Sequence, residues 1–334
     1  MSEPLVSVKD VIKTFGGGKG FFSKKPVVHA INGVSFDIMP GETFALVGES
    51  GCGKSTTGRL IDHLLTPDSG EIWFNGKDIT KLTENEMRPL RADVQMIFQD
   101  PYGSLNPRIR VSDLIAEPLL IHTDSSENER KKQVNELLKV VGLSPAHGER
   151  FPHEFSGGQR QRIGIARALT VHPKLIIADE PVSALDVSIQ AQVLNLMSRL
   201  QKNYDLTYLF ISHDLSVVEM IADRIAVMYL GTIVETASKK ELFDHPRHPY
   251  TRALLSAVPI PDPTKKSDRI ILKGDLPSTT NLPSGCLFRT RCKYCQERCI
   301  KERPKTREIS TGHFIKCHYP VFDEGEKEEK DVSV

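Results

Sequence analysis

Short stretches that alternate apolar and polar residues open the chain and predict β-strands. One is VSVKDVI, from Val6, and another is VSFDIM, from Val34, with a loop rich in Gly and Lys, GGGKGFFSKKP (16–26), before the second. Runs of this kind, bounded by turn-forming residues, are typical of strands joined by loops. We therefore expect a β lobe at the start of the chain.

The pattern then changes to that of an α/β core. The apolar run Thr43 to Val47 leads through a Gly-rich turn into a helix-like segment, Lys54 to Leu65, which predicts a strand, loop and helix unit. Further on, the buried-type runs Leu175 to Ala178 and Tyr208 to Ile211 enclose a helical stretch, Ile189 to Leu200. Strands that alternate with helices in this way predict a mainly parallel sheet.

A helical pattern fills the region between these parts of the core. From about residue 107 to residue 155 the chain consists mostly of helix formers and has few β-branched runs. Its apolar residues recur at helical spacing, for example Val134, Leu137, Leu138 and Val141, as on the buried face of a helix. We therefore expect a helical subdomain over about residues 102–165.

The composition is that of an ordinary globular protein. The 334 residues include 44 basic and 43 acidic side chains, for a net charge of +1, so charge gives no reason to expect nucleic acid as a partner. The most apolar stretches, Leu175 to Ala178 and Arg224 to Val234, are far shorter than the roughly 20 residues that span a bilayer. The N-terminus lacks the apolar core of a signal peptide, and we expect the chain to stay in the cytosol.

Beyond about Arg247 the sequence becomes rich in Pro and Cys, which is typical of a small separate module. Five of the six cysteines lie there, between Cys286 and Cys317, and a cytosolic chain keeps few disulfides. We assign the module to residues 251–322 and expect a metal site in it. The charged end, residues 323–334, is expected to be a disordered tail.

A glycine-rich motif carries the clearest chemistry in the sequence. It matches the pattern GxxxxGK(S/T) in full, directly after a predicted strand and before a predicted helix, the context in which backbone N–H groups and a helix N-terminus bind phosphate. Its residues are Gly48, Glu49, Ser50, Gly51, Cys52, Gly53, Lys54, Ser55 and Thr56. We expect Lys54 to reach the β and γ phosphates of a nucleotide and the Ser55 hydroxyl to bind Mg²⁺.

Two adjacent carboxylates end the predicted buried strand LIIADE, residues 175–180. Asp179 can hold Mg²⁺ through water, and Glu180 can polarise the water that attacks a phosphate. A hydrophobic run followed by Asp and Glu is common by itself. Together with the phosphate loop it predicts a site of nucleotide hydrolysis.

The segment FSGGQRQR, residues 155–162, makes the sequence resemble the nucleotide-binding domains of ABC transporters. The other motifs of that family are present in order: Gln99 in FQD, SALD at residues 183–186, and His213 in ISHD. The resemblance covers about residues 5–250. It implies a P-loop α/β core with an antiparallel β lobe and a helical subdomain.

The resemblance also implies roles in ATP hydrolysis. Gln99 would sense the γ-phosphate and couple it to membrane subunits, His213 would contact the γ-phosphate, and with Glu180 these form the expected catalytic set. Phe15 stands where the family places an aromatic that stacks on adenine, and a core Phe is the alternative. The expected Mg²⁺ ligands are Ser55, Gln99 and Asp179.

A helix start near residue 156 is a second predicted phosphate-binding site, because a Ser hydroxyl followed by small residues can cap an anion there. The residues are Ser156, Gly157, Gly158 and Gln159. In ABC transporters this cap faces the ATP of a partner subunit. The resemblance therefore implies a dimer with two ATP molecules between the subunits.

The region after residue 247 resembles the C-terminal extension of importers for oligopeptides, dipeptides and nickel, in HPYTRALLSAVPIPDP (248–263), LKGDLPS and SGCLFRTRC. This implies ATP hydrolysis that drives peptide import, by a protein peripheral to the cytoplasmic side of the cell membrane. The expected partners are a second ATPase subunit in a heterodimer, two transmembrane permease subunits and an extracytoplasmic substrate-binding protein. The alternatives are a nickel importer and a non-transport ABC ATPase that acts on nucleic acid.

Four cysteines match the cysteine pattern of that branch, which some members use to hold a four-iron, four-sulfur (4Fe-4S) cluster. They are Cys286, Cys292, Cys299 and Cys317. Cys295 departs from the pattern and creates a C-x₂-C pair that could equally bind zinc, and unliganded thiols are the third alternative. The metal would stabilise the module and take no part in catalysis. We expect His313 and His318 to be ordinary surface histidines.

Overall fold

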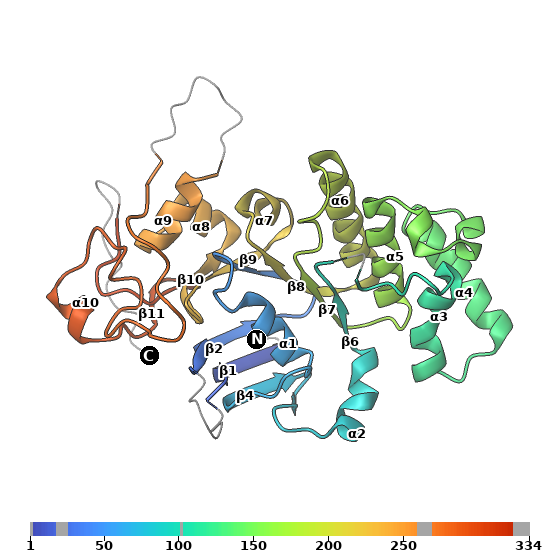
Figure 1. The fold of residues 1–334 in the computed structure, drawn as a ribbon, viewed down its shortest axis with the longest axis horizontal. Coiled ribbons are helices and arrows are strands. Elements are labelled where there is room, and N and C mark those ends of the chain that lie inside the picture. Colours follow the sequence, from blue (N-terminus) through green and yellow to red (C-terminus); the bar gives the residue numbers. More distant parts are fainter. Residues whose placement is uncertain (1–2, 18–25, 101–102, 259–268, 323–334) are drawn as a thin grey trace.

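The computed structural model describes residues 3–17, 26–100, 103–258 and 269–322. They form an antiparallel sheet, a larger mixed sheet with helices, a helical region at one end and a C-terminal region at the other (Figure 1). The α/β core with an antiparallel β lobe that the sequence predicts is confirmed. Most of the loop at 16–26 and the tail expected at 323–334 lie outside the described residues.

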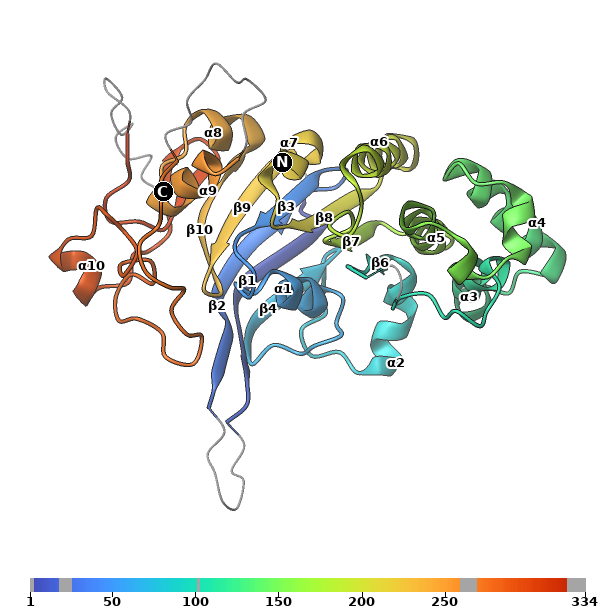
Figure 2. The same cartoon turned by 45° about the horizontal axis from the view of Figure 1, so that its top comes forward.

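Four antiparallel strands form the β lobe. They are β1 (Val6–Phe15), β2 (Val28–Ile38), β4 (Ser69–Phe74) and β5 (Lys77–Asp78), in the order β2-β1-β4-β5. The two strands predicted at the start of the chain are present. They are longer than the apolar pattern indicated because β1 and β2 stay paired as far as Phe15 and Val28. Figure 2 shows this ribbon of two strands extending away from the rest of the molecule.

The main sheet has eight strands in the order β11-β12-β10-β9-β3-β8-β7-β6. The strands are β3 (Thr43–Val47), β6 (Val94–Ile97), β7 (Leu175–Asp179), β8 (Thr207–Ser212), β9 (Arg224–Tyr229), β10 (Thr232–Ser238), β11 (Arg307–Ser310) and β12 (His313–Ile315). The five strands from β9 to β6 are parallel, as the alternation of strands and helices predicted. The remaining three strands continue the sheet in antiparallel order.

The two faces of the parallel strands belong to two different hydrophobic cores. In β3, Phe44 and Leu46 pack with residues of the β lobe, whereas Ala45 and Val47 pack with the helices on the other face. Side chains alternate between the faces of a strand, so a strand that is covered on both faces is apolar throughout. All five residues of β3 are buried, which explains the unbroken apolar run in its sequence.

Helices cover the main sheet and form the region beside it. They are α1 (Lys54–Ile61), α2 (Glu84–Met87), α3 (Val111–His122), α4 (Glu127–Val140), α5 (Gly157–Leu169), α6 (Val187–Tyr204) and α7 (Leu215–Ile221), with 3-10 turns at Arg88–Ala92, Pro145–Glu149 and Pro152–Glu154. The expected buried face of α4 is confirmed at Val134, Leu137 and Leu138. α1 ends at Ile61, before the expected Leu65, because a turn follows in which His63 has a left-handed φ of 54°.

None of the helices among the described residues combines the length and the apolar character needed to cross a bilayer. The helices of the C-terminal region are α8 (Lys239–Asp244), α9 (Pro249–Ser256) and α10 (Glu297–Lys301). Each is short. The longest helix of the described residues is α6, with 18 residues, and it packs its apolar face on the main sheet.

The C-terminal region is joined to the main sheet, although its composition indicated a separate module. β12 pairs with β10, and Leu287 and Phe288 belong to the same core cluster as Val193 of α6. The region has too few apolar residues to build a core of its own. It buries those it has against the edge of the sheet instead.

A buried carboxylate fastens this region in place. Glu235 of β10 accepts hydrogen bonds from the backbone N–H groups of Arg247 (2.7 Å) and His248 (3.0 Å). Its carboxylate also lies 2.8 Å from Nε2 of His313, whose Nδ1 lies 3.2 Å from Glu241. Burial by itself raises the pKa of Glu235, but hydrogen bonds outweigh it and hold that pKa below its ordinary value. The expectation of a surface position is wrong for His313, which is fully buried because it partners Glu235.

Candidate active site

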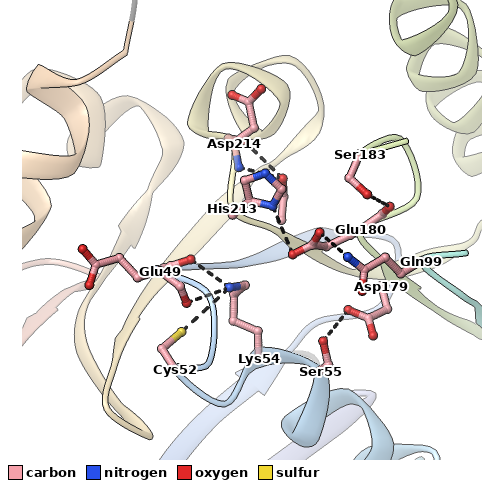
Figure 3. A network of polar contacts seen from close by, with 12 residues as sticks. Glu49, Cys52, Lys54, Ser55, Gln99, Asp179, Glu180, Ser183, His213 and Asp214 are labelled. Carbon is pink, nitrogen blue, oxygen red and sulfur yellow. Dashed lines mark hydrogen bonds and ion pairs between the residues drawn. The ribbon is translucent and has the colours of Figure 1, made fainter. Parts of the chain in front are cut away.

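The Gly-rich loop (48–53) curls around the ammonium group of Lys54. This group donates hydrogen bonds to the carbonyl oxygens of Gly48 (2.8 Å) and Glu49 (3.1 Å), as Figure 3 shows. At Gly48 a Cβ atom would lie 2.2 Å from the carbonyl oxygen of Met228 in β9. Only glycine allows the loop to pass so close to that strand. The loop therefore holds a buried cation at the start of α1, where the helix dipole also favours an anion.

Ser55 and Asp179 meet beside the loop. The Ser55 hydroxyl, in the first turn of α1, donates a 2.8 Å hydrogen bond to the carboxylate of Asp179 at the end of β7. Burial raises the pKa of Asp179, and the bond from Ser55 opposes this shift. A hydroxyl and a carboxylate side by side are hard oxygen ligands of the kind that Mg²⁺ prefers. The two residues thus fit the magnesium site expected from the sequence.

Glu180 is the centre of a polar network at the ends of three strands. One carboxylate oxygen accepts a hydrogen bond from Nε2 of Gln99 (2.8 Å), and the other lies 3.1 Å from Nδ1 of His213 (Figure 3). Because β6, β7 and β8 are neighbours and parallel, the residues after them meet at one edge of the sheet. Glu180 has a φ of 47°, a strained conformation of a kind that clusters at functional sites. The three residues expected to be catalytic therefore lie together.

The start of α5 lies away from the loop. The hydroxyl of Ser156 accepts a hydrogen bond from the backbone N–H of Gln159 (3.4 Å), whose side-chain oxygen accepts one from the backbone N–H of Ser156 (3.0 Å). After Gly157, a Cβ atom at Gly158 would lie 2.4 Å from a methyl carbon of Ile189 in α6. Figures 1 and 2 both show α5 well separated from α1. Within one chain these residues are not brought to the phosphate loop.

Phe15, the expected adenine-stacking residue, lies at the end of β1. Its side chain is exposed, with the ammonium group of Lys13 5.7 Å from the ring centre. The structure does not place Phe15 in the core, which was the alternative. A ring with a free face is what stacking requires, but no described contact links Phe15 to the loop.

The four expected cysteine ligands converge on one small cavity of about 10 Å³. Its lining residues include Cys286, Cys292, Cys299, Cys317 and Phe288. Burial raises the pKa of Cys292 to about 11 and that of Cys317 to about 12, so both thiols hold their protons at neutral pH. In the described part of the chain, no three His, Cys, Asp or Glu side chains are arranged as metal ligands. Cys295 does not line this cavity, and the half-buried His318 does.

Two residues that contact the phosphate loop could not be found from the sequence. The guanidinium group of Arg291 donates hydrogen bonds to the carboxylate of Glu49 at 2.7 and 3.1 Å. The hydroxyl of Tyr250 accepts a 3.0 Å hydrogen bond from the backbone N–H of Glu49. Both lie in segments that resemble the C-terminal extension, not in a nucleotide motif, and Arg291 lies 242 positions after Glu49, so no spacing or periodicity pointed to the contact.

Two family models match the chain. Residues 31–183 match one described as ABC transporter, and residues 234–299 match one described as the C-terminal region of oligopeptide/dipeptide transporters. The first match includes the phosphate loop, Glu180 and the start of α5. The second includes Tyr250 and Arg291, the residues that reach the loop from outside the nucleotide motifs.

Curated proteins and solved structures show the same likeness. The oligopeptide transport ATP-binding protein AppF of Bacillus subtilis is 54% identical, over 95% of this chain and 97% of its own length. The dipeptide transport ATP-binding protein DppF of Escherichia coli is 48% identical, over 97% of each chain. A dimeric structure of the ATP-binding cassette MJ0796, in a post-hydrolysis state with ADP and Pi, matches with a TM-score of 0.63 and 30% identity, over 70% of this chain and 98% of that one.

Proposed function

Since the chain belongs to the ABC transporter family, we propose that it is the subunit that binds and hydrolyses ATP to drive the import of oligopeptides or dipeptides. The names of two relatives about half identical to this chain support the peptide substrate. A nickel importer with a similar extension is the alternative. An ATPase subunit of this kind does not contact the cargo, so only a transport measurement distinguishes a peptide importer from a nickel importer.

The observation that carries the function is the network around Glu180, next to the phosphate loop. Glu180 orients the attacking water and accepts its proton, while the water oxygen bonds to the γ-phosphorus and the bond to the bridging oxygen breaks. Gln99 and His213, which contact its carboxylate, hold it in place and turn to the γ-phosphate when ATP is bound. Lys54 meets the β and γ phosphates.

Magnesium is part of the proposal, because the hydroxyl of Ser55 and the carboxylate of Asp179 already meet at 2.8 Å. These two residues would hold the ion, with Gln99 as the third expected ligand. Bound Mg²⁺ neutralises negative charge on the phosphate oxygens. Phe15 would stack on the adenine, which its exposed ring permits.

A second ATPase subunit completes the site. Ser156, Gly157, Gly158 and Gln159 lie at the start of α5, far from the loop of their own chain. They would cap the γ-phosphate of ATP bound to a partner, so that two subunits enclose two ATP molecules. We propose a heterodimer, because the loop at 16–26 resembles that of one member of a pair of ATPases. The dimeric relative supports the pairing of cassettes.

The permease would dock beside Gln99. A cavity of about 290 Å³ lies between β6, α3 and α5. Phe98 and Ile121, which are 43% and 53% exposed, line it. Exposed apolar side chains in a hollow are typical of protein interfaces. We assign the hollow to a helical segment of a permease subunit, which would keep this chain on the cytoplasmic face of the membrane. An extracytoplasmic protein would deliver the peptide.

The test is uptake of a labelled peptide, supplied together with the extracytoplasmic binding protein, into vesicles that hold both permease subunits, the partner ATPase and this chain. With ATP the wild-type complex should accumulate peptide, and the Lys54→Ala complex should not. Accumulation of Ni²⁺ in place of peptide would support the nickel alternative. ATP hydrolysis without uptake of either would contradict an importer.

We propose further that the C-terminal cysteines hold a metal group, a 4Fe-4S cluster or, as the alternative, zinc. The support is that four thiols from distant positions surround one cavity, which matches the donor set of either group. Ligation would remove the protons that burial now holds on Cys292 and Cys317. The thiols would also have to draw into ligand geometry around the group.

Metal content of protein purified without oxygen tests this part. A cluster gives a brown protein with about four iron and four sulfide per chain, and zinc gives a colourless protein with about one metal ion. Cys292→Ser should lose the group. The control is Cys295→Ser, which should keep a cluster, because Cys295 does not line the cavity. Metal-free wild-type protein with freely alkylated cysteines would refute the proposal.

A further inference from the structure

The phosphate loop and the C-terminal region are connected through Glu49. Arg291 binds its carboxylate with two parallel hydrogen bonds, from Nη1 at 2.7 Å and from Nη2 at 3.1 Å. Such a fork fixes the direction of the carboxylate as well as its distance. The side chains of Arg291 and Glu49 are only 10% and 29% exposed, so water screens this pair less than an ion pair on the surface. The hydrogen bonds to Glu49 raise the pKa of Arg291.

The backbone of Glu49 is held from the same side. Its N–H donates to the hydroxyl of Tyr250, a fully buried side chain of α9. The ring of Tyr250 packs against those of Tyr229 and Phe288, with centroids 4.8 and 5.4 Å away. Rings locked in this way cannot turn without disturbing the core. The backbone N–H and the carboxylate of Glu49 are thus both held by residues of the C-terminal region.

The position of Glu49 matters to the loop for two reasons. Its carbonyl oxygen is one of the two acceptors that hold the ammonium group of Lys54. Its carboxylate points away from Lys54 in Figure 3, which keeps a negative charge out of the space where phosphate would bind. A carboxylate without a cationic partner would repel the phosphates of ATP at short range.

We propose that Arg291 is a positioning residue of the nucleotide site, which neutralises Glu49 and holds its carboxylate outside the phosphate loop. ATP affinity then depends on the C-terminal region, although that region lies outside every nucleotide motif. The inference rests on the proposed binding of ATP at the loop. Arg291 acts through Glu49 and not on the nucleotide itself.

The experiment measures the affinity of the purified full-length chain for ATP with Mg²⁺. Arg291→Met should raise the dissociation constant about tenfold, because it leaves the Glu49 carboxylate unpaired. Adding Glu49→Gln to that variant should restore the constant to within about threefold of wild type, because no unpaired charge is left. Arg291→Met/Glu49→Gln is thus expected to bind better than the single variant.

Arg289→Met is the matched control. Arg289 lies two positions earlier in the same segment and donates its hydrogen bonds to Ser284, so this variant should bind ATP like wild type. With the partner ATPase present, Arg291→Met should raise KM for ATP and leave kcat nearly unchanged, since Arg291 acts on binding. A structural loss would instead lower the amount of active protein and with it the apparent kcat.

Two results would overturn the inference: Arg291→Met binding ATP as tightly as Arg289→Met, or the double variant binding no better than Arg291→Met. If thermal melting shows that Arg291→Met does not fold, Arg291→Lys takes its place, since it keeps the charge but loses the fork. Its affinity for ATP should then be lower than that of wild type, and an affinity equal to wild type would overturn the inference. Wild-type protein that fails to bind ATP would contradict the proposed function, which is a different outcome.

Discussion

The polar side chains around Glu180 and those around Glu235 are organised in opposite ways. Around Glu180 they stand at the open edge of the parallel strands, where the side chain of His213 is 55% exposed. Around Glu235 they are enclosed, and the side chains of Glu235 and His313 are both fully buried. Both carboxylates have partners within the chain, but the open edge leaves room for a nucleotide and water beside Glu180, whereas the burial of Glu235 leaves none.

One residue type can therefore serve chemistry or architecture, depending on which groups its carboxylate contacts. Glu180 has its backbone fixed, since its N–H donates to the carbonyl of Ile211. Its carboxylate contacts two side chains at the open edge, Gln99 and His213. The carboxylate of Glu235 instead contacts β12 and the residues at the start of α9. The same substitution, Glu→Gln, should therefore damage a different property in each region.

Catalysis should change most. Glu180→Gln keeps the shape of the side chain and removes its basicity, so ATP turnover with the partner subunit should fall by about 100-fold or more. ATP affinity and the unfolding midpoint should stay close to wild type. Glu219→Gln, at an exposed position of α7, is the control. If Glu180→Gln instead lowered the unfolding midpoint and left the turnover per folded molecule unchanged, the comparison would fail.

The next effect is on stability. Glu235→Gln places an amide N–H₂ where a carboxylate now accepts hydrogen bonds, which leaves donors facing each other in a buried site. The free energy of unfolding in urea should drop by about 3 kcal/mol, while the turnover per folded molecule should change little. An unchanged urea midpoint would show that the buried cluster does not fasten the C-terminal region.

The smallest effect is on pH dependence and comes from His248 in the enclosed cluster. Burial lowers its pKa from the ordinary 6.5 to about 4, and Glu235 opposes this shift. As the pH falls, the unfolded chain therefore takes up this proton before the folded one. The contribution of His248 to the free energy of unfolding is full above pH 6.5 and is lost between pH 6.5 and pH 4. Between about pH 7 and pH 5 wild type should lose about 2 kcal/mol more than His248→Asn.

The Asn side chain still offers an acceptor to the backbone N–H of Tyr250, as His248 does at the start of α9. Asp62 has the opposite sign: burial raises its pKa from 3.8 to about 7, so its contribution is lost as the pH rises over that range. Asp62 is present in both proteins and cancels in the difference. If the free energy of unfolding changed with pH by the same amount in both proteins, this role of His248 would be excluded.

The open site was largely predictable from the sequence, because its residues belong to short motifs directly after strands. Lys54 and Ser55 follow a Gly-rich turn, and Glu180 follows an unbroken apolar strand. The sequence assigned Gln99, His213 and Glu180 to one catalytic set but did not predict that their side chains touch. Their geometry follows once β6, β7 and β8 are neighbours in one sheet.

The enclosed cluster was not predictable, because its contacts are made by single residues far apart in the chain. β11 and β12 have four and three residues, which is too short for a period to be seen. His313 had no signal that it would face a carboxylate 78 positions earlier. The contact of Arg291 with Glu49 is still more distant, and only the folded chain brings the two together.

The pairing of β12 with β10 also determines when the main sheet can be completed during synthesis. Until residue 315 has left the ribosome, the edge of β10 has no neighbour on that side and Glu235 lacks His313. Closing so long a segment is slow in folding terms, and an open strand edge invites aggregation in the meantime. A nascent chain that stops before His313 therefore carries every ATP motif but not a finished sheet, and this part of the sheet closes only after residue 315 has been made.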